Sequence, residues 1–366
     1  MARELNLGGS ERQMTETARF LDRAQFEPRV GCFLPAGLRG EELRAAGVPV
    51  IQFPVHSYKS WSAVEGARQL VRYIREERIE LVHAFDYPLN VFALPLARWF
   101  TQAVAVASQR SHRELIPGGY RRAVRVVDRV ADAVVVNCEY LRSHLVRDEG
   151  VPADRVEVCY NGIDLDFFAA GESSRPAALA DASFVIGVVC GLRAEKGLPL
   201  LLEAFARVRG LREGMKLAIV GSGPLLDELL ARARELGILE ACVFQPATSR
   251  IPDWLRAMDL FVLPSLSEAF SNALMESMAC GCCSVASNVG GNPELVRAGE
   301  TGLLFERGDV GSLSDALQRL IGDEGLRKQL AVNGQSYVRG SFSAQTAARR
   351  MGEIYARLIA RRPRTR

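Results

Sequence analysis

Short apolar runs alternate with longer amphipathic segments along most of the chain. In the first half these runs cover residues 28–34, 49–55, 79–85, 103–108, 132–138 and 155–161. In the second half they cover residues 184–191, 216–223, 241–246, 260–265 and 283–288. Apolar positions recur at helical spacing in the segments between them, as in 62–78 with Val64, Ala67, Leu70, Val71 and Ile74. Strands that alternate with helices predict an α/β fold with parallel sheets covered on both faces.

The alternation lapses over residues 161–183, where glycine, serine, proline and other small residues accumulate. The chain has 366 residues, more than the ~250–300 at which one hydrophobic core usually stops growing. We therefore expect two doubly wound domains, 1–165 and 166–343, followed by a helix and a basic tail in 344–366. Ligands of open α/β sheets bind beyond the carboxyl ends of the strands, so a cleft between two facing domains is the expected site.

The amino end departs from this pattern. A doubly wound domain normally begins with a strand that leads into its first glycine loop, but only MAREL precedes the segment that holds Gly8 and Gly9. We expect a first strand that is short or missing: either the true start lies upstream, or the strand is reduced to a few residues and the first sheet is weakened at a central position. Gly8 and Gly9 precede a predicted helix over 11–21, where glycine lets the backbone approach a phosphate closely.

Charge and cysteine content narrow the function classes. The formal net charge is +3, from 46 Lys and Arg against 43 Asp and Glu, which does not indicate a general nucleic-acid binder. The eight cysteines are sparse and lie mostly in apolar runs, as in proteins of reducing compartments. Cys280, Cys282 and Cys283 cluster, but no second pair or nearby histidine completes a metal site, so we expect buried thiols. No signal-peptide core and no run of ~18 apolar residues occurs, and we expect a cytoplasmic location.

The segment LFVLPSLSEAFSNALMESMACG, residues 260–281, carries the most chemistry. A buried strand ends at Pro264 and Ser265, and a helix begins near Ser271 or Asn272, either of which is a good N-cap. Two carboxylates, Glu268 and Glu276, flank this helix N-terminus, which attracts anions such as phosphate. Carboxylates beside a phosphate would repel it unless they contact hydroxyl groups. A ligand that combines phosphate with polyol parts, such as a nucleotide sugar, fits this pattern.

The motif EAFSNALME (268–276) resembles the donor-site motif of family-four glycosyltransferases of the GT-B fold. Five further segments match that family in order: LGGSERQ (7–13), YNGIDLDFF (160–168), GLRAEKGLPLLLEAF (191–205), IVGSGP (219–224), and ASNVGGNPELV (286–296) with GETGLLFERGD (299–309). The resemblance implies two facing Rossmann-like domains, with the final helix crossing back onto the first. It also implies transfer of a sugar from a nucleotide diphosphate sugar with retention, without an essential metal and without a cofactor besides the donor.

The resemblance also implies roles for individual residues. Glu276 would bind the ribose hydroxyls of the donor, and Glu268 would hold hydroxyls of the transferred sugar. Lys196 would neutralise the diphosphate. The remaining donor-side residues would approach the sugar and the diphosphate or line the donor site: Gly9, Ala269, Phe270, Ser271 and Asn272.

Two positions depart from the family pattern. Many members carry an arginine five residues before the lysine, where this chain has Gly191; Arg193, three residues before Lys196, is the candidate replacement. After the fourth strand of the first domain the family often places a histidine against the sugar. Arg110 occupies the aligned position and His112 follows two residues later, so either of these candidate catalytic groups could face the sugar.

The expected partners are the nucleotide-sugar donor and a glycan or lipid-linked acceptor. Arginines on the predicted helix after PGGY and in the tail RRPRTR (361–366) could hold the enzyme at an anionic membrane surface: Arg121, Arg122, Arg125 and Arg129. A solvated basic face and a frayed terminus are the alternative interpretation. Two other functions stay open, a nucleotide-sugar 2-epimerase of the same architecture and a non-catalytic nucleotide-sugar binder.

Overall fold

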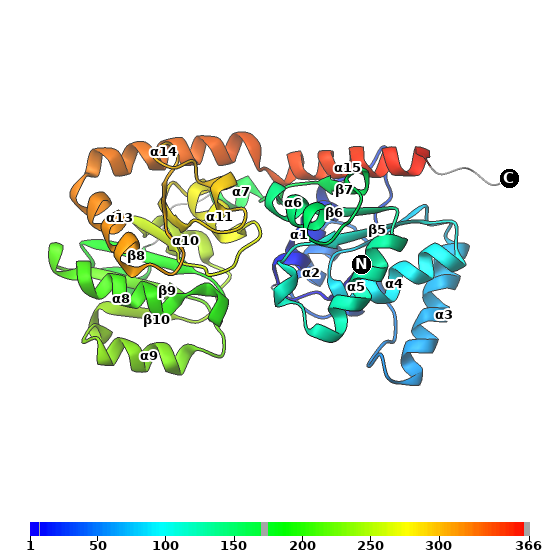
Figure 1. Ribbon diagram of the computed structural model, residues 1–366, viewed down its shortest axis with the longest axis horizontal. Coiled ribbons are helices and arrows are strands. Elements are labelled where there is room, and N and C mark those ends of the chain that lie inside the picture. The colour runs from blue at the N-terminus through cyan, green and yellow to red at the C-terminus, as the bar shows by residue number, and fades with distance from the viewer. Residues whose placement is uncertain (7, 170–174, 362–366) are drawn as a thin grey trace. The chain divides into compact units, whose positions relative to one another are not determined.

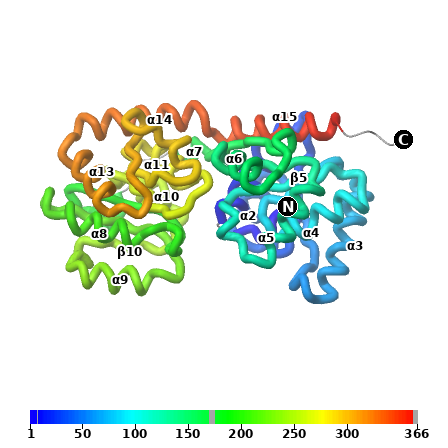
Figure 2. Tube along the Cα trace, viewed as in Figure 1, coloured from blue at the N-terminus to red at the C-terminus, as the bar shows by residue number. Residues whose placement is uncertain are grey.

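The computed structural model describes residues 1–6, 8–169 and 175–361, and it divides into two compact units (Figures 1 and 2). Unit 1 comprises Met1–Gly162 together with Ala344–Arg366, and unit 2 comprises Ile163–Ser343. The division falls three residues before the boundary that we placed at residue 165. Helix α15 (Ala344–Arg361) returns the chain to unit 1 after unit 2 is complete.

Unit 1 is built on parallel strands in two hydrogen-bonded segments. The first has the order β1-β2-β3, with β1 (Ala2–Glu4), β2 (Val30–Leu34) and β3 (Val50–Gln52). The second has the order β4-β5-β6-β7, with β4 (Leu81–Ala84), β5 (Val104–Gln109), β6 (Ala133–Val136) and β7 (Val156–Val158). The amide of Phe85 donates to the carbonyl oxygen of Met1 at 3.0 Å, so β1 lies between β2 and β4. The first strand is therefore short and central, as predicted, and the sheet ladder is interrupted beside it.

Helices cover both faces of these strands. They are α1 (Gly9–Phe20), α2 (Leu38–Ala45), α3 (Trp61–Glu76), α4 (Tyr87–Phe100), α5 (Gly118–Val130), α6 (Glu139–Arg147) and α15. On one face Met351, Ile354 and Leu358 of α15 pack against Val106 of β5 and Val135 of β6 in a buried cluster. On the other, α3, α4 and α5 are neighbours in that order. The predicted return of the last helix onto the first domain is confirmed.

Unit 2 is a single six-stranded parallel sheet of order β10-β9-β8-β11-β12-β13. Its strands are β8 (Phe184–Val189), β9 (Met215–Val220), β10 (Cys242–Gln245), β11 (Leu260–Leu263), β12 (Cys283–Ser287) and β13 (Leu303–Phe305). The described helices are α7 (Leu165–Ala169), α8 (Leu198–Val208), α9 (Leu226–Glu235), α10 (Ile251–Arg256), α11 (Asn272–Ala279), α12 (Asn292–Leu295), α13 (Val310–Gly322) and α14 (Glu324–Ser341). Five of the strands match predicted runs. We did not predict β13, because its apolar run is only Leu303, Leu304 and Phe305, between a glycine and a charged residue.

Both units confirm the α/β prediction, because every strand pairing is parallel and the strands alternate with helices. The core of unit 2 is a continuous buried cluster that includes Phe184, Phe205, Leu217, Val262 and Val285. A rigid parallel sheet of this kind fixes the loops that leave its carboxyl edge. Those loops carry most of the residues that the sequence singled out.

Candidate functional site

The loop between β11 and α11 lies at the carboxyl edge of the sheet in unit 2. Ser271 is the N-cap of α11, and its hydroxyl oxygen accepts a hydrogen bond from the amide of Leu274 at 3.3 Å. This confirms the predicted start of the helix. The amide groups of Ala269 and Ser271 form no hydrogen bond with described residues. They are donors that a ligand at this helix N-terminus could use.

The loop between β11 and α11 is held in place by two glycine-containing loops, which follow the neighbouring strands β8 and β12. Gly197 follows β8 with φ +62°, and a Cβ at this position would overlap the carbonyl oxygen of Pro264. Gly290 follows β12 with φ +56°, and its Cβ would overlap the carbonyl oxygen of Glu268. Backbone hydrogen bonds fasten both sides, from Leu266 to Glu195 at 2.8 Å and from Gly291 to Ala269 at 2.7 Å. The three motifs AEKG, SEAF and NVGG thus form one structural unit.

Lys196 and Glu268 meet across this edge. The Lys196 Nζ lies 2.6 Å from Glu268 Oε2, and the hydroxyl of Ser265 donates to the same oxygen at 3.2 Å. Only 14% of the lysine side chain and 13% of the glutamate side chain is exposed. Two groups that we assigned separately to the diphosphate and to the sugar therefore form an ion pair with each other.

Glu276 occupies the first turns of α11, as predicted, and is 4% exposed. Four residues before it stands Asn272, on the same face of the helix. Ala269, Phe270 and Ser271 are buried to a similar degree. All the predicted donor-side residues of the 268–276 motif thus gather at one loop and one helix end.

Arg193 is not a member of this ion pair. Its guanidinium bonds to the carboxylate of Glu195 at 2.9 Å, and 60% of its side chain is exposed. It is the N-cap residue of the short 3₁₀ turn that holds Lys196. Its use as the phosphate-binding arginine stays a prediction.

Arg110 follows β5 at the carboxyl edge of unit 1. Its Nη1 donates to Asn161 Oδ1 at 2.7 Å, and the guanidinium lies over the Phe85 ring at 4.9 Å from the centroid. Its Nε is buried without a hydrogen-bond partner, and the described residues give it no carboxylate. Burial lowers the pKa of this guanidinium to about 10. A buried cation without a counter-anion favours binding of an anionic group.

His112 has other contact partners. Its ring stacks on His144 with 4.4 Å between centroids, and its Nδ1 accepts a hydrogen bond from the amide of Glu114 at 3.4 Å. Burial of the ring is the main cause that lowers the pKa of His112, and the neighbouring His144 lowers it further. The structure therefore gives Arg110 and His112 different contact partners.

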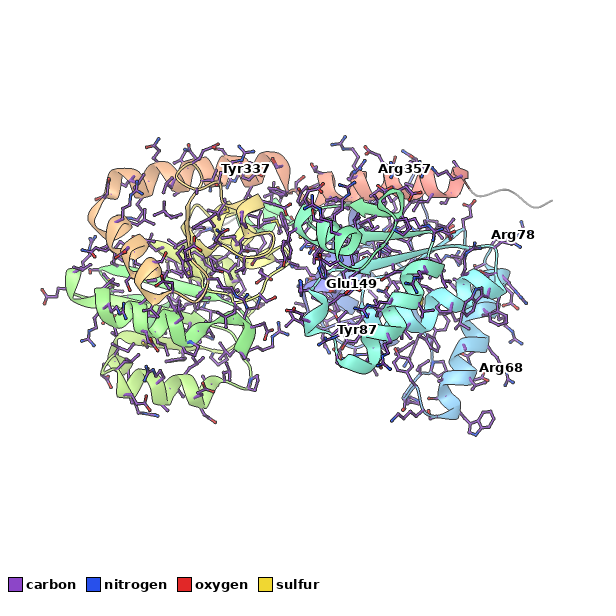
Figure 3. The ribbon with its side chains drawn as sticks, viewed as in Figure 1. Arg68, Arg78, Tyr87, Glu149, Tyr337 and Arg357 are labelled. Carbon is purple, nitrogen blue, oxygen red and sulfur yellow. The ribbon has the colours of Figure 1, made fainter. Side chains whose placement is uncertain are left out.

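The loop that carries both residues is anchored by Arg113, which we did not single out. This side chain is 3% exposed and pairs with Asp128 of α5 and, at 3.0 Å, with Glu149. Figure 3 marks Glu149. An arginine in a polar loop has no sequence signal for burial, because its usual partner is water.

Gly9 is the first residue of α1, in unit 1, and Gly8 is its N-cap. A Cβ on Gly8 would overlap the carboxylate of Glu11, which lies against this helix end. Burial raises the pKa of Glu11. The α1 terminus therefore already has a carboxylate of its own beside it, and a role for Gly9 in donor binding stays a prediction.

Comparisons with known proteins decide the family. A model described as Glycosyltransferase Family 4 matches residues 7–167, and one described as Glycosyl transferases group 1 matches residues 171–337. A GDP-mannose-dependent alpha-(1-6)-phosphatidylinositol monomannoside mannosyltransferase of Mycolicibacterium smegmatis is 30% identical over 307 residues, which is 79% of each chain. The chain belongs to glycosyltransferase family 4. The two models fall almost entirely on unit 1 and unit 2 respectively.

Other relatives of this family 4 member match less of their length. A D-inositol 3-phosphate glycosyltransferase of Mycobacterium sp. (strain JLS) is 36% identical over 203 residues, 54% of this chain and 46% of the relative. The chain thus matches about half the length of several curated relatives. Among solved structures, a glycosyltransferase from Rickettsia africae has TM-score 0.82 at 19% identity, covering 98% of both chains. HepE from Anabaena, solved with UDP, has TM-score 0.82 at 22% identity, covering 97% of this chain and 99% of its own. These structures confirm the GT-B fold with two Rossmann-like domains.

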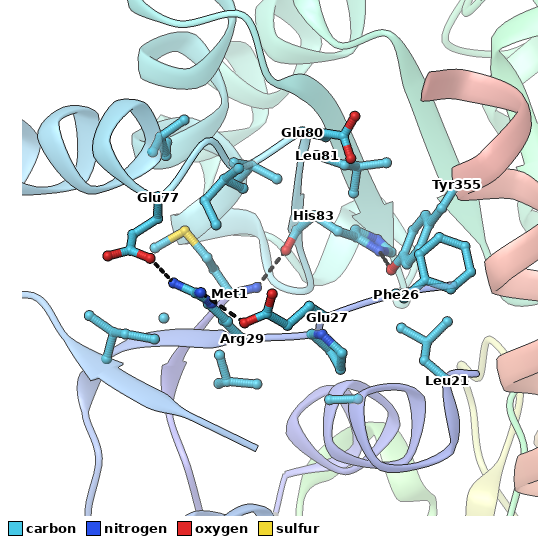
Figure 4. Close-up of a pocket in the computed structure, with 18 of the residues that line it drawn as sticks. Met1, Leu21, Phe26, Glu27, Arg29, Glu77, Glu80, Leu81, His83 and Tyr355 are labelled. Carbon is cyan, nitrogen blue, oxygen red and sulfur yellow. Dashed lines mark hydrogen bonds and ion pairs between the residues drawn. The ribbon is translucent and has the colours of Figure 1, made fainter. Parts of the chain in front are cut away.

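A cavity of about 300 Å³ in unit 1 of this family 4 member lies at the opposite, amino edge of the strands (Figure 4). His83 is buried beside it, with Nδ1 2.6 Å from the Tyr355 hydroxyl and Nε2 2.7 Å from the Ser108 hydroxyl. Burial holds the pKa of His83 well below its usual value. Arg29 on the cavity wall is paired with Glu77. The cavity contains none of the candidate site residues, so we do not assign the reaction to it.

Cys280, Cys282 and Cys283 are free thiols that lie buried or half-buried in the fold. Cys282 Sγ donates to the carbonyl oxygen of Leu255 at 2.9 Å, and burial raises the pKa of Cys280 to about 12. Within residues 1–6, 8–169 and 175–361, no three histidine, cysteine or acidic side chains are grouped as metal ligands. Among the described helices, none combines the length and the apolar character needed to cross a bilayer.

Proposed function

We propose that this family 4 member transfers a sugar from a nucleoside diphosphate sugar to an acceptor hydroxyl, with retention at the anomeric carbon and without an essential metal. The observation that supports this best is the Lys196–Glu268 ion pair on the loop that leads into α11. The same loop presents the amides of Ala269 and Ser271, and Glu276 lies on the helix behind them. An ammonium group and amide donors suit the negative charge of a diphosphate. The carboxylates of Glu268 and Glu276 suit the hydroxyl groups of the rings attached to its two ends.

In this proposal the donor separates the ion pair. The Lys196 ammonium turns to the diphosphate, whose charge grows as the bond to the sugar breaks, and Glu268 accepts hydrogen bonds from sugar hydroxyls. A cation about 4 Å from a phosphate oxygen contributes up to about 4 kcal/mol of attraction at an effective dielectric near 20. That attraction increases toward the transition state, which is the condition for a rate effect.

Retention and metal independence rest on the family resemblance. In a front-face reaction the departing phosphate takes the proton of the acceptor hydroxyl as the new glycosidic bond forms on the side that the phosphate leaves. Glu268 is the nearest carboxylate that could act as a nucleophile, but its Oε2 already accepts from Lys196 and Ser265. We therefore assign it to hydroxyl binding.

We place the acceptor on unit 1, at the carboxyl edge that holds Arg110. A glycan or a lipid-linked acceptor is the proposed class. The named relatives support a phosphate-bearing acceptor, since one is called after a phosphatidylinositol mannoside and another after inositol 3-phosphate. The buried cation of Arg110 suits such an anion. We propose a cytoplasmic location, at the inner face of the membrane when the acceptor is a lipid.

A panel of uridine, guanosine and adenosine diphosphate sugars, screened by thermal stabilisation, tests donor binding, because a ligand of the folded state raises the melting temperature. Calorimetry should then show saturable uptake of one nucleotide class. Absence of uptake of every such compound by well-folded protein would end the proposal.

Incubation of the selected donor alone separates the alternatives. A transferase releases nucleoside diphosphate quickly only when an acceptor is added. A 2-epimerase would convert the sugar without an acceptor, and a non-catalytic binder would release no nucleoside diphosphate under either condition.

A further inference from the structure

The arginines that the sequence offers for membrane contact are engaged within the fold. Arg121 donates to the carbonyl oxygen of Ile116 at 2.8 Å, and Arg125 pairs with Glu149 at 2.6 Å. Residues 362–366 of the basic tail lie outside the described part of the chain. Membrane contact therefore stays a prediction, and buried side chains of unit 2 support a different inference.

Three fully buried polar side chains lie behind the loop that carries Glu268. Ser265 lies shortly after β11, Ser287 is the last residue of β12, and Asn292 is the first residue of α12. Each of these three residues is 0% exposed. Polar groups at such positions cost free energy unless they form hydrogen bonds. Their partners therefore indicate what these residues contribute.

Hydrogen bonds link the three residues in order. The Nδ2 of Asn292 donates to the carbonyl oxygen of Ser287 at 3.0 Å, and the Ser287 hydroxyl donates to the carbonyl oxygen of Ser265 at 2.6 Å. The amide of Leu266, in the same peptide unit as that last carbonyl, donates to the carbonyl oxygen of Glu195 at 2.8 Å. The peptide unit 265–266 is therefore held from two sides, and this fixes the direction in which the Ser265 side chain leaves the backbone.

The two carboxylate oxygens of Glu268 have different surroundings. Oε2 accepts from the Lys196 Nζ at 2.6 Å and from the Ser265 hydroxyl at 3.2 Å. Oε1 forms no hydrogen bond with described residues, and it is not among the buried atoms that lack a partner, so it is open to a ligand. The contact with Ser265 is longer than the ~2.7 Å usual between a hydroxyl and a carboxylate. It can therefore shorten when the ammonium group leaves the same oxygen.

We propose that Ser265 is a positioning residue for Glu268, and that Ser287 and Asn292 hold Ser265 in place. The inference rests on the proposed function, in which the donor draws Lys196 to its diphosphate. Oε2 then loses the ammonium group but keeps the Ser265 hydroxyl, so the carboxylate does not rotate and Oε1 stays directed at the hydroxyl groups of the sugar. A glutamate that is fixed before the sugar binds loses less conformational entropy on binding.

The second polar atom of Asn292 supports a role in the site. Its Oδ1 is buried and has no hydrogen-bond partner among the described residues. An unpaired buried acceptor destabilises the folded state, and native proteins keep such groups mainly where function requires them. A residue retained for stability alone would not leave half of its amide unpaired.

Calorimetry with two ligands tests the proposal. The ligands are the nucleoside diphosphate sugar selected from the panel and the same nucleoside diphosphate without the sugar. Ser265→Ala should bind the first about tenfold more weakly and the second within about twofold of the unchanged protein, because one hydrogen bond to a charged group is lost on the sugar side only. Ser287→Ala should change the ratio of the two affinities in the same direction by about threefold. A general loss of structure would weaken both ligands alike, so this ratio reports positioning.

Control variants separate positioning from packing. Ser284→Ala is the matched control, because Ser284 is a fully buried serine of β12 whose hydroxyl bonds to Ser277, and it should bind both ligands as the unchanged protein does. Ser265→Cys keeps the size of the side chain but has a weak donor, so it should reproduce the loss even where Ser265→Ala does not fold. With Glu268→Ala already present, Ser265→Ala should change the ratio by less than about twofold, since no carboxylate is left to position.

Four results would each overturn the positioning role: an unchanged ratio in Ser265→Ala and Ser265→Cys, an equal loss for both ligands, the same loss in Ser284→Ala, or an undiminished effect in the Glu268→Ala background. An unchanged ratio in Ser287→Ala would remove Ser287 and Asn292 from the proposal. Failure of the unchanged protein to bind any nucleoside diphosphate compound would overturn the proposed function and the positioning role with it. Normal donor binding with unaffected Ser265 variants would overturn the positioning role alone.

Discussion

Lys196 and Glu268 are 72 positions apart in sequence, yet the ammonium nitrogen of one lies 2.6 Å from a carboxylate oxygen of the other. The pair forms because β8 and β11 are adjacent strands and both loops leave the same edge of the sheet. Each group holds the other in position in the absence of ligand. In the proposed function, the donor replaces this internal contact with contacts of its own.

Replacing Lys196 should weaken the reaction strongly. In Lys196→Ala the diphosphate loses the ammonium group proposed to bind it and Glu268 is left without its partner, so kcat/KM should fall by on the order of 10² to 10³. Steady-state kinetics with the selected donor measures the loss. Lys328→Ala, which removes a lysine from an exposed pair with Glu324, is the matched control and should retain full activity.

Glu268→Gln should retain measurable donor binding while turnover falls to a small fraction, because the amide keeps the shape of the side chain but accepts hydroxyl hydrogen bonds less strongly. Calorimetry and product formation report the two effects separately. Combined with Lys196→Ala, it should cost less than the sum of the single changes, since the two groups share one interaction. Full activity of Glu268→Gln would remove this residue from the mechanism.

The glycines that support the loop should be sensitive to added volume. Gly197→Ala and Gly290→Ala introduce a Cβ at positive φ, which costs roughly 1–2 kcal/mol, and also push against backbone oxygens of the 264–268 loop. Both should lower the melting temperature and weaken donor binding. Gly308→Ala has the same strain at φ +74° with open space around it, so it should cost stability without affecting the donor. Equal donor affinity in all three variants would contradict this assignment.

Arg110 and His112 can be told apart by parallel substitutions. Arg110→Gln keeps a donor for Asn161 but removes the buried charge, and should lower turnover by about 10², the size of one charge-stabilising contact. His112→Gln should lower it by less than about tenfold, because its ring packs on His144. Donor affinity should stay within about twofold in both variants. The opposite order of effects would make His112, and not Arg110, the catalytic candidate of this loop.

The pH dependence of stability should report His83. Its folded-state pKa is held well below 6.5, so the unfolded chain binds an extra proton once the pH falls below about 6.5. The stability that this group contributes is therefore complete above about pH 6.5 and declines as pH falls toward the folded-state pKa, with a slope of at most ~1.4 kcal/mol per pH unit. Denaturant unfolding at pH 7.5, 6.5 and 5.5 should show a flatter profile for His83→Gln than for the unchanged protein.

Local patterns in the sequence were sufficient to predict every strand from β2 to β12, the α/β class and the final helix, and to limit the N-cap of α11 to Ser271 or Asn272. These features depend on neighbours within a few residues: apolar runs of strand length, helical spacing, and a hydroxyl before a helix. The motif 268–276 also determined which carboxylates belong to the candidate donor site, because its residues share one loop and one helix.

The tertiary structure decided what those residues contact. Lys196 pairs with Glu268, Arg113 is buried against Asp128 and Glu149, and Arg110 and His112 point to different neighbours although two positions separate them. Each depends on which strands become adjacent and on how much water the packing removes, and no local pattern records either. The exposed aromatic residues of α3 and α4 show the same limit: apolar periodicity marks the buried side of a helix, but only packing reveals that Trp61 and Trp99 are left outside.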